Sequence, residues 1–199
     1  PFLEAYLHSN STRNNDYGIF INHLSSKGNV KNALLDTNFS DSKATFYYKQ
    51  FERDYNWQVN AGAKHQTNNW YGLPQNLTYT TSFLDDIDAK QKYLNLFAKG
   101  KVHFEDGFFK GGKIVINQFS DNYNSNEIHL LIQPKIEFPI SSELINTSAT
   151  IEFLSGKFNQ NYADMNNIDY NFLKLGISPN FKVLRTDLTL NLGAKIYYN

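Results

Sequence analysis

The sequence predicts an all-β fold, an antiparallel up-and-down transmembrane β-barrel with about ten strands visible. Segments of about ten residues alternate between apolar and polar side chains, which is the two-residue period of a β-strand. Short turns and long loops also alternate along the chain, as they do in outer-membrane barrels. Aromatic residues make up 16% of the chain, with 13 Tyr and 16 Phe, and such a content suits strands with interfacial aromatic girdles.

The first half of the chain predicts four strands. Phe2–Ser9 alternates cleanly, and Tyr17–Ser25 alternates less cleanly after a short polar turn. Ala44–Arg53 and Tyr55–Gln66 are joined by a tight turn near Asp54 and together predict a hairpin.

The second half predicts six more strands. Tyr93–Phe104, Lys113–Ser120, Ile128–Phe138, Ile145–Phe153 and Leu173–Val183 each place apolar residues at every second position. The last strand is the clearest, at Asp187–Tyr198. One face of this strand carries Leu188, Leu190, Leu192, Ala194 and Ile196, and the other face carries Thr189, Asn191, Gly193 and Lys195.

The connections predict two different rims. Those after odd-numbered strands are short, whereas Ser26–Ser42 and Thr67–Lys90 are long and GKFNQNYADMNN is intermediate. The loop after the sixth strand is a short exception. Pro134 and Pro179 fall inside predicted strands, and because proline cannot donate to a ladder we expect a bulge or a sheet edge there.

Composition excludes several functions. The formal charge is zero, with 19 Lys+Arg and 19 Asp+Glu, so we expect no nucleic-acid partner. The chain has no Cys, which excludes thiolate catalysis and Cys-ligated metals. The mean hydropathy is −0.52 and no apolar run is long enough for a spanning helix, whereas a β-barrel wall, with only half of its residues apolar, is compatible with this value.

The candidate chemical groups predict neither a metal site nor an enzyme, and we expect no cofactor. The five histidines occur singly on separate strands: His8, His23, His65, His103 and His129. Asp85, Asp86 and Asp88 lack the glycine and glutamate of an EF-hand loop and predict a solvated acidic loop. KGGK at Lys110–Lys113 is too short for a phosphate-binding loop and predicts a turn. A barrel hydrolase would need Ser, His and an orienting Asn or Asp close together, which the sequence alone does not indicate.

The alternation assigns residues to two faces of the barrel wall. We expect these residues to face the lumen: Lys64, Asn95, Lys99, Lys101, His103, Gln133, Lys135, Lys174, Asn191 and Lys195. We expect these residues to face lipid: Trp57, Val59, Leu94, Leu96, Ile132, Ile151, Leu175, Leu188, Leu190 and Leu192. Interfacial aromatics are expected near strand ends and in adjoining loops: Trp57, Trp70, Tyr71, Phe108, Phe109, Phe138, Tyr197 and Tyr198.

Four stretches resemble the barrel portion of TonB-dependent-receptor-like outer-membrane proteins of Bacteroidota-type bacteria. They are His23–Asp41, Asn68–Pro74, Phe104–Ile114 and Leu184–Tyr198. The resemblance implies an outer-membrane barrel of receptor or transport type in a Gram-negative bacterium, with full-length members extending on both sides. No plug domain or TonB-box-like segment is visible, so energy-coupled uptake is not transferred to any residue.

We therefore expect residues 1–199 to be a single β-barrel domain or a fragment of a larger barrel. The expected role is a channel wall with ligand-facing extracellular loops, and the ligand is unknown. Outer-membrane lipid is the expected partner, together with other outer-membrane or periplasmic proteins. The alternatives are a structural or assembly-scaffold barrel, a soluble β-sandwich binding module whose core is the apolar face, and a barrel hydrolase.

Overall fold

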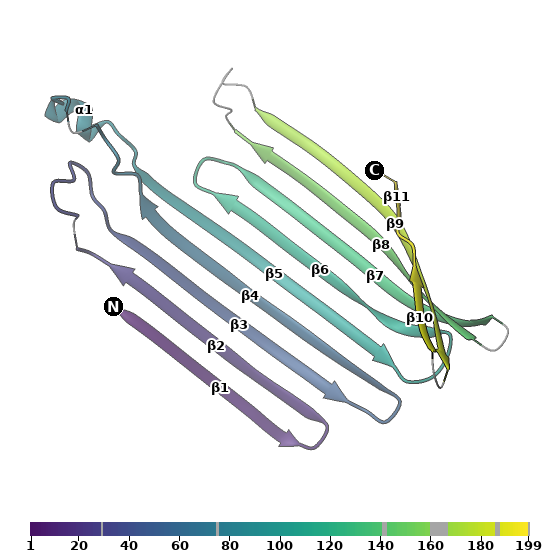
Figure 1. Ribbon diagram of the computed structural model, residues 1–199. Helices are drawn as coiled ribbons and strands as arrows, with labels where there is room; N and C mark the ends of the chain where they lie inside the picture. The colour runs from purple at the N-terminus through teal and green to yellow at the C-terminus, as the bar shows by residue number, and fades with distance from the viewer. Residues whose placement is uncertain (29, 75, 141–142, 160–166, 186–187, 199) are drawn as a thin grey trace.

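The computed structural model contains one antiparallel sheet in which each strand pairs with the next along the chain (Figure 1). It describes all residues except 29, 75, 141–142, 160–166, 186–187 and 199. The strand order runs from β1 to β10 without a crossover, and β11 also pairs with β9. The predicted all-β, up-and-down arrangement is therefore confirmed.

The strands are long, from 11 to 18 residues apart from the last two. Their bounds are β1 Phe2–Thr12, β2 Asn15–Ser26, β3 Phe39–Phe51, β4 Tyr55–Asn69, β5 Lys90–Phe104, β6 Phe109–Asp121, β7 Asn126–Ile140, β8 Glu143–Phe158, β9 Ile168–Arg185, β10 Leu188–Gly193 and β11 Ile196–Tyr198. One short helix, α1, at Thr81–Asp85 is capped by the Thr80 side chain and lies in the loop before β5.

The strand register gives the sheet one apolar and one polar face. Residues directly opposite each other share a face, so one cross-strand row traces each side. On the apolar face the row is Leu7, Ile19, Phe46, Ala61, Ala98, Ile116, Leu130, Phe153 and Leu173. On the polar face the row is Asp16, Lys49, Gln58, Lys101, Lys113 and Gln133.

Burial is the reverse of that in a water-soluble domain. No hydrophobic side chain among the described residues is buried, and Leu7 on the apolar face is 67% exposed. The buried side chains are polar, including Gln91 and Thr150. All described strands belong to one sheet, so the β-sandwich alternative has no second sheet in this part of the chain.

The sheet is curved but open. The pairings end at β1 on one side and at β10 with β11 on the other, so the closed barrel that we expected is not formed by the described strands. In Figure 1 the β9–β11 side turns edge-on to the viewer while β1 to β5 lie nearly face-on. The barrel itself therefore remains a prediction.

The two rims differ as predicted. Connections 13–14, 52–54 and 105–108 are short and lie at one end of the sheet, whereas 27–38 and 70–89 are long and lie at the other (Figure 1). The connection 122–125 after β6 is short, as expected.

Three local predictions were wrong. β3 begins at Phe39, earlier than Ala44, because the ladder continues through polar residues that do not alternate. KGGK lies inside β6 rather than in a turn, with a register shift between Phe109 and Gly111. The last strand is interrupted between Gly193 and Ile196.

Both prolines sit where the ladder is irregular. Pro134 lies opposite Gly112, next to the register shift in β6, and its pairing with β8 is interrupted. Pro179 lies opposite Thr147, and its carbonyl oxygen accepts a hydrogen bond from the Ala194 amide at 3.1 Å, where β10 gives way to β11. The bulge that we expected at Pro134 lies in the partner strand β6. The sheet edge that we expected is not found at Pro179, because β9 pairs with β8 on one side and with β10 and β11 on the other.

Glycines on the polar face make room for aromatic rings on neighbouring strands. Each of four glycines lies directly opposite an aromatic residue whose ring occupies the space of its missing side chain. The pairs are Gly18 with Tyr47, Gly62 with Phe97, Gly156 with Tyr170 and Gly176 with Tyr197. A side chain in place of any of these glycines would overlap the ring opposite it.

Candidate functional site

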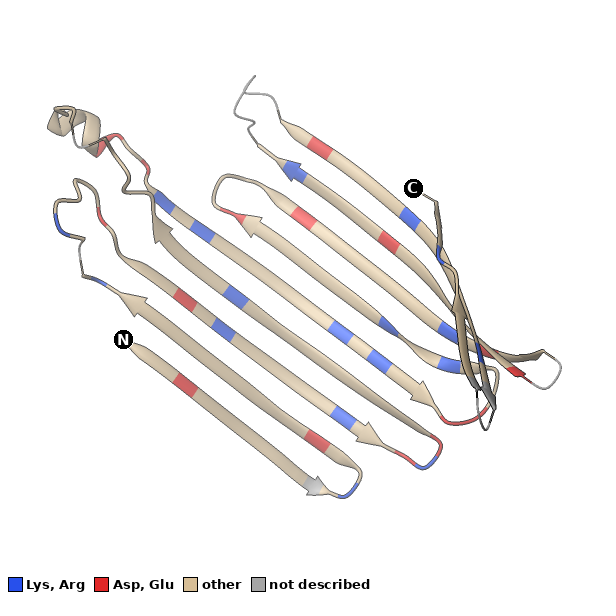
Figure 2. Ribbon diagram, viewed as in Figure 1, with Lys and Arg blue, Asp and Glu red and all other residues tan. Residues whose placement is uncertain are grey.

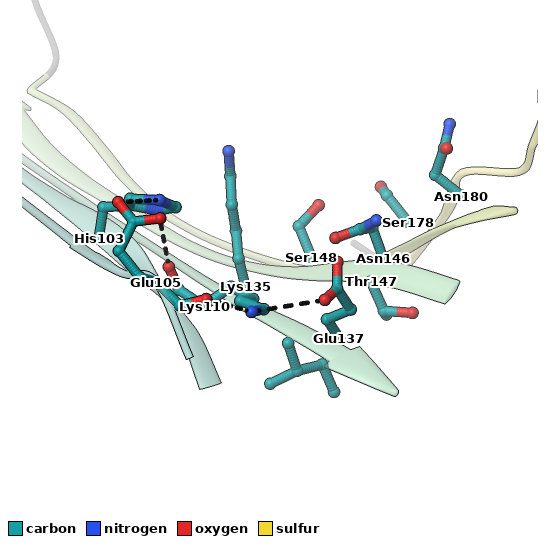
Figure 3. A pocket seen from close by; sticks show the side chains of 11 residues that line it. His103, Glu105, Lys110, Lys135, Glu137, Asn146, Thr147, Ser148, Ser178 and Asn180 are labelled. Carbon is teal, nitrogen blue, oxygen red and sulfur yellow. Dashed lines mark hydrogen bonds and ion pairs between the residues drawn. The ribbon is translucent and has the colours of Figure 1, made fainter. Parts of the chain in front are cut away.

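The polar face lies on the inner side of the curve. Figure 3 shows the ribbon bending toward the side on which Lys135, Asn146 and Ser148 project, while Thr147 points the other way. This alternation matches the register, in which Lys135 lies opposite Ser148. Functional groups on this face therefore converge, whereas the apolar side chains diverge.

The β5–β7 hollow is the first concave site on the polar face. It has a volume of about 480 Å³. Its lining is Asn56, Gln58, Lys101, Val102, His103, Lys110, Gly112, Lys113, Gln133 and Lys135. The lining includes four lysines and three amide side chains but no carboxylate.

The β3–β5 hollow lies on the same face toward the long-loop rim. Its lining is Lys43, Thr45, Asn60, Lys64, Asn95, Phe97, Lys99 and Asn117. Lys43 and Lys99 each hold their ammonium about 6 Å from the centre of the Phe97 ring, at 5.8 and 5.9 Å. This hollow too is lined by ammonium and amide groups without a carboxylate.

Carboxylates beside these hollows are bound to partners of their own. The Asp16 carboxylate lies 3.3 Å from the Nζ of Lys49 and 2.9 Å from the Nε2 of His8. It also accepts a hydrogen bond from the Tyr47 hydroxyl at 3.0 Å. Asp41 holds Lys64 at 3.1 Å and accepts a hydrogen bond from Gln66. Most of the negative charge of the polar face is thus engaged locally.

A second network of polar contacts extends from β7 to β11. Glu152 contacts the Nε2 of His129 at 2.9 Å and the Nζ of Lys174 at 3.7 Å. The Lys174 ammonium also lies 4.4 Å from the centre of the Tyr197 ring. Tyr170 donates a hydrogen bond to Glu127 on the same face.

Toward the short-turn rim, the hollow shown in Figure 3 mixes both charges. Lys110 forms an ion pair with Glu137 at 3.5 Å, and His103 lies 3.7 Å from Glu105. Lys135 extends from the sheet without a dashed contact to any neighbour drawn there. Each lysine-lined hollow thus has one lysine paired with a carboxylate outside its lining, Lys110 with Glu137 and Lys64 with Asp41.

The two long loops meet at the opposite rim. A hollow of about 470 Å³ is lined by Leu34 and Asp36 of one loop and by Leu84 and Asp88 of the other. Asn69 donates a hydrogen bond to Asn38 at 3.1 Å across their bases. The loops that we expected to meet ligand therefore form a joint surface.

The apolar face carries aromatic rings along the short-turn rim. The Tyr48 and Trp57 rings are 5.1 Å apart, and those of Phe104 and Phe109 are 5.7 Å apart. Tyr17, Tyr55, Phe108 and Phe138 extend the series through neighbouring ring contacts. Tyr197, by contrast, lies over Gly176 on the polar face, and Trp70 and Tyr71 lie in the loop after β4.

The register places the two predicted sets on opposite faces of the sheet. Lys64, Asn95, Lys99, Lys101, His103, Gln133, Lys135, Lys174 and Asn191 are on the polar face, and Lys195 falls in the break between β10 and β11. Trp57, Val59, Leu94, Leu96, Ile132, Ile151, Leu175, Leu190 and Leu192 are on the apolar face. The side chain of Leu188 lies outside the described residues. Whether these faces meet a lumen and lipid stays a prediction.

Several residues that line the hollows were not predicted to face the lumen, among them Lys43, Gln58, Asn60 and Lys113. Lys113 was assigned both to the KGGK turn and to the start of the strand that follows it, and Lys43 fell between the long loop and the strand Ala44–Arg53. The alternation of β6 carried a signal for Lys113 once Phe109 is taken as the strand start, whereas Phe39–Lys43 does not alternate and carried none for Lys43.

No group of three or more His, Cys, Asp or Glu suited to a metal ion occurs among the described residues. Within the same part of the chain, no helix is long and apolar enough to cross a membrane. Comparison of the chain with protein-family models, curated proteins and solved structures found no match. The class defined so far is a curved, open antiparallel meander with one apolar and one polar face.

Proposed function

We propose that this chain forms the wall of an outer-membrane β-barrel of the receptor or transport type, similar to the TonB-dependent-receptor-like proteins. The observation that carries the proposal is the reversed burial: apolar side chains are exposed on the outer side of the curve, and polar ones line the inner side. Such a sheet is stable where lipid covers its outer face and water its inner face.

The dimensions and rims support this proposal. β3, with 13 residues, exceeds the roughly 9–11 residues that a tilted strand needs to cross the hydrocarbon core. Aromatic rings follow one rim of the apolar face, as they do at a headgroup interface. The joint surface of loops 27–38 and 70–89 then faces outward and meets the ligand.

The open edges of the sheet need partners in a bilayer because unpaired backbone groups are costly there. With β10 and β11 counted as one interrupted strand, the sheet has an even number of strands, so β1 and β10 run antiparallel. Pairing these edges with each other, or with further strands, closes the wall.

Ion conductance tests the proposal. Purified protein added to a planar lipid bilayer is expected to produce stepwise conductance, because the polar face then lines a water-filled path. Absence of conductance, with other outer-membrane proteins co-purifying in stable complexes, would overturn the transport role and favour the assembly-scaffold alternative.

A further inference from the structure

We propose that the β5–β7 hollow binds small anionic solutes that carry phosphate or carboxylate groups. This inference deepens the proposed function, since it names the class of ligand that the polar face would bind or pass. It rests on three features of the hollow: its lysines, its amides and the lack of any carboxylate in its lining.

A cross-strand pair of like charges lies in the β5–β7 hollow. Lys101 on β5 and Lys113 on β6 are direct partners in the ladder, on the same face. Like charges directly opposite each other destabilise a sheet. Both lysines therefore cost stability where they stand, and a bound anion between them would reverse that cost.

Three ammonium groups of the hollow have no partner among the described residues. Among the ion pairs and hydrogen bonds of the described residues, none engages the side chains of Lys101, Lys113 or Lys135. Lys135 on β7 is two residues from Gln133, the partner of Lys113, so three strands bring one lysine each to the hollow. All three are exposed to solvent and can receive a ligand.

The hollow also contains neutral hydrogen-bond donors. Gln58 is the ladder partner of Lys101, and Gln133 is the partner of Lys113. Gln133 donates to the hydroxyl of Thr150 at 3.1 Å, which fixes its amide at the edge of the hollow. Ammonium and amide groups on one concave surface match the acceptor oxygens of phosphate or carboxylate.

The β3–β5 hollow extends the same chemistry along the face. Lys43 and Lys64 are direct cross-strand partners there, with Lys64 ion-paired to Asp41, and Lys99 is part of the lining. Figure 2 shows basic positions, all of them Lys, on each of β3 to β7. An anion leaving the first hollow therefore finds a second site of like composition, although the whole chain has no net charge.

Calorimetric titration in zwitterionic detergent at low salt tests the inference, with inorganic phosphate and citrate as probes. The hollow variant is Lys101→Gln/Lys113→Gln/Lys135→Gln. The matched control is Arg53→Gln/Lys92→Gln/Lys157→Gln, which removes the same charge outside the hollows. Wild type and control are expected to bind alike, and the dissociation constant of the hollow variant is expected to rise roughly tenfold.

A single substitution distinguishes loss of anion binding from loss of folding. Lys113→Glu places a carboxylate opposite Lys101, which should raise the thermal midpoint of unfolding while abolishing phosphate binding. Equal affinity in wild type and both hollow variants would overturn the inference. So would an equal loss in the control, because net charge alone would then explain binding.

Two further experiments distinguish a lipid ligand from a free solute, and failure of the anion site from failure of the channel. Phosphatidylglycerol added to the detergent should leave phosphate affinity unchanged, and competition by that lipid would overturn the assignment to a free solute. Phosphate binding without bilayer conductance would refute the channel and leave the anion site standing. Conductance without phosphate or citrate binding would refute the anion site alone.

Discussion

Single residues shape the polar face through pairs of glycine and aromatic side chains. Gly156 on β8 is buried, and the three atoms nearest to a hypothetical β-carbon all belong to the Tyr170 side chain. The Tyr170 hydroxyl donates to Glu127, so the ring cannot turn aside without losing that bond. Aromatic rings also lie against Gly18, Gly62 and Gly176, and at Gly18 and Gly62 a backbone oxygen lies nearer still.

We expect Gly156→Ala to destabilise the protein by about 1–3 kcal/mol, because the added methyl overlaps the Tyr170 ring. The measurement is the urea midpoint of unfolding in detergent. Gly72→Ala is the matched control, since nothing lies within 4 Å of its β-carbon. Gly156→Ala/Tyr170→Ala should show coupling, and strictly additive effects of the two substitutions would refute the packing explanation.

At the scale of strands and loops, the alternation predicted which residues share a face, because a two-residue period fixes side-chain direction along any strand. Strand ends were less predictable. FSDSK at Phe39–Lys43 continues the ladder without an apolar row, and Gly111 and Gly112 suggested a turn where Gly111 serves a bulge at a φ of 125°. The α1 turn in the second long loop carried no periodic signal, because it is only 5 residues long.

The two rims should lie on opposite sides of the membrane. The chain has no Cys, so single substitutions can be labelled selectively. We expect Gly72→Cys, in loop 70–89, to react with a membrane-impermeant maleimide on intact cells, and Asp54→Cys, in turn 52–54, to react only after the outer membrane is permeabilised. Equal labelling of both positions on intact cells would contradict the rim assignment.

At the scale of the whole molecule, curvature and closure were beyond the sequence pattern. Alternation is the same in a flat sheet, a sandwich and a barrel, so it did not predict an open edge at β1 or at β10. The lysine-lined hollows were also only partly predictable. Lys101 and Lys113 become neighbours through the β5–β6 register, which continues without a shift to Gly111, where the sequence suggested a glycine-rich turn.

Charge shows the same limit at this scale. Equal numbers of acidic and basic residues predicted no electrostatic footprint. In the fold, carboxylates such as Asp16, Asp41 and Glu152 are paired, while lysines gather unpaired on the inner side of the curve. A neutral chain can therefore present a basic concave surface.

Trp57 can report whether the apolar face meets lipid. The chain has two tryptophans, so Trp70→Phe leaves only Trp57, which lies on the apolar face in the aromatic rim beside Tyr48. In vesicles of brominated phospholipid, we expect strong quenching of its fluorescence, strongest with bromine near the headgroup. Trp57→Phe, which leaves Trp70 in the loop, should respond instead to aqueous iodide. Quenching of Trp57 by iodide but not by brominated lipid would contradict the account.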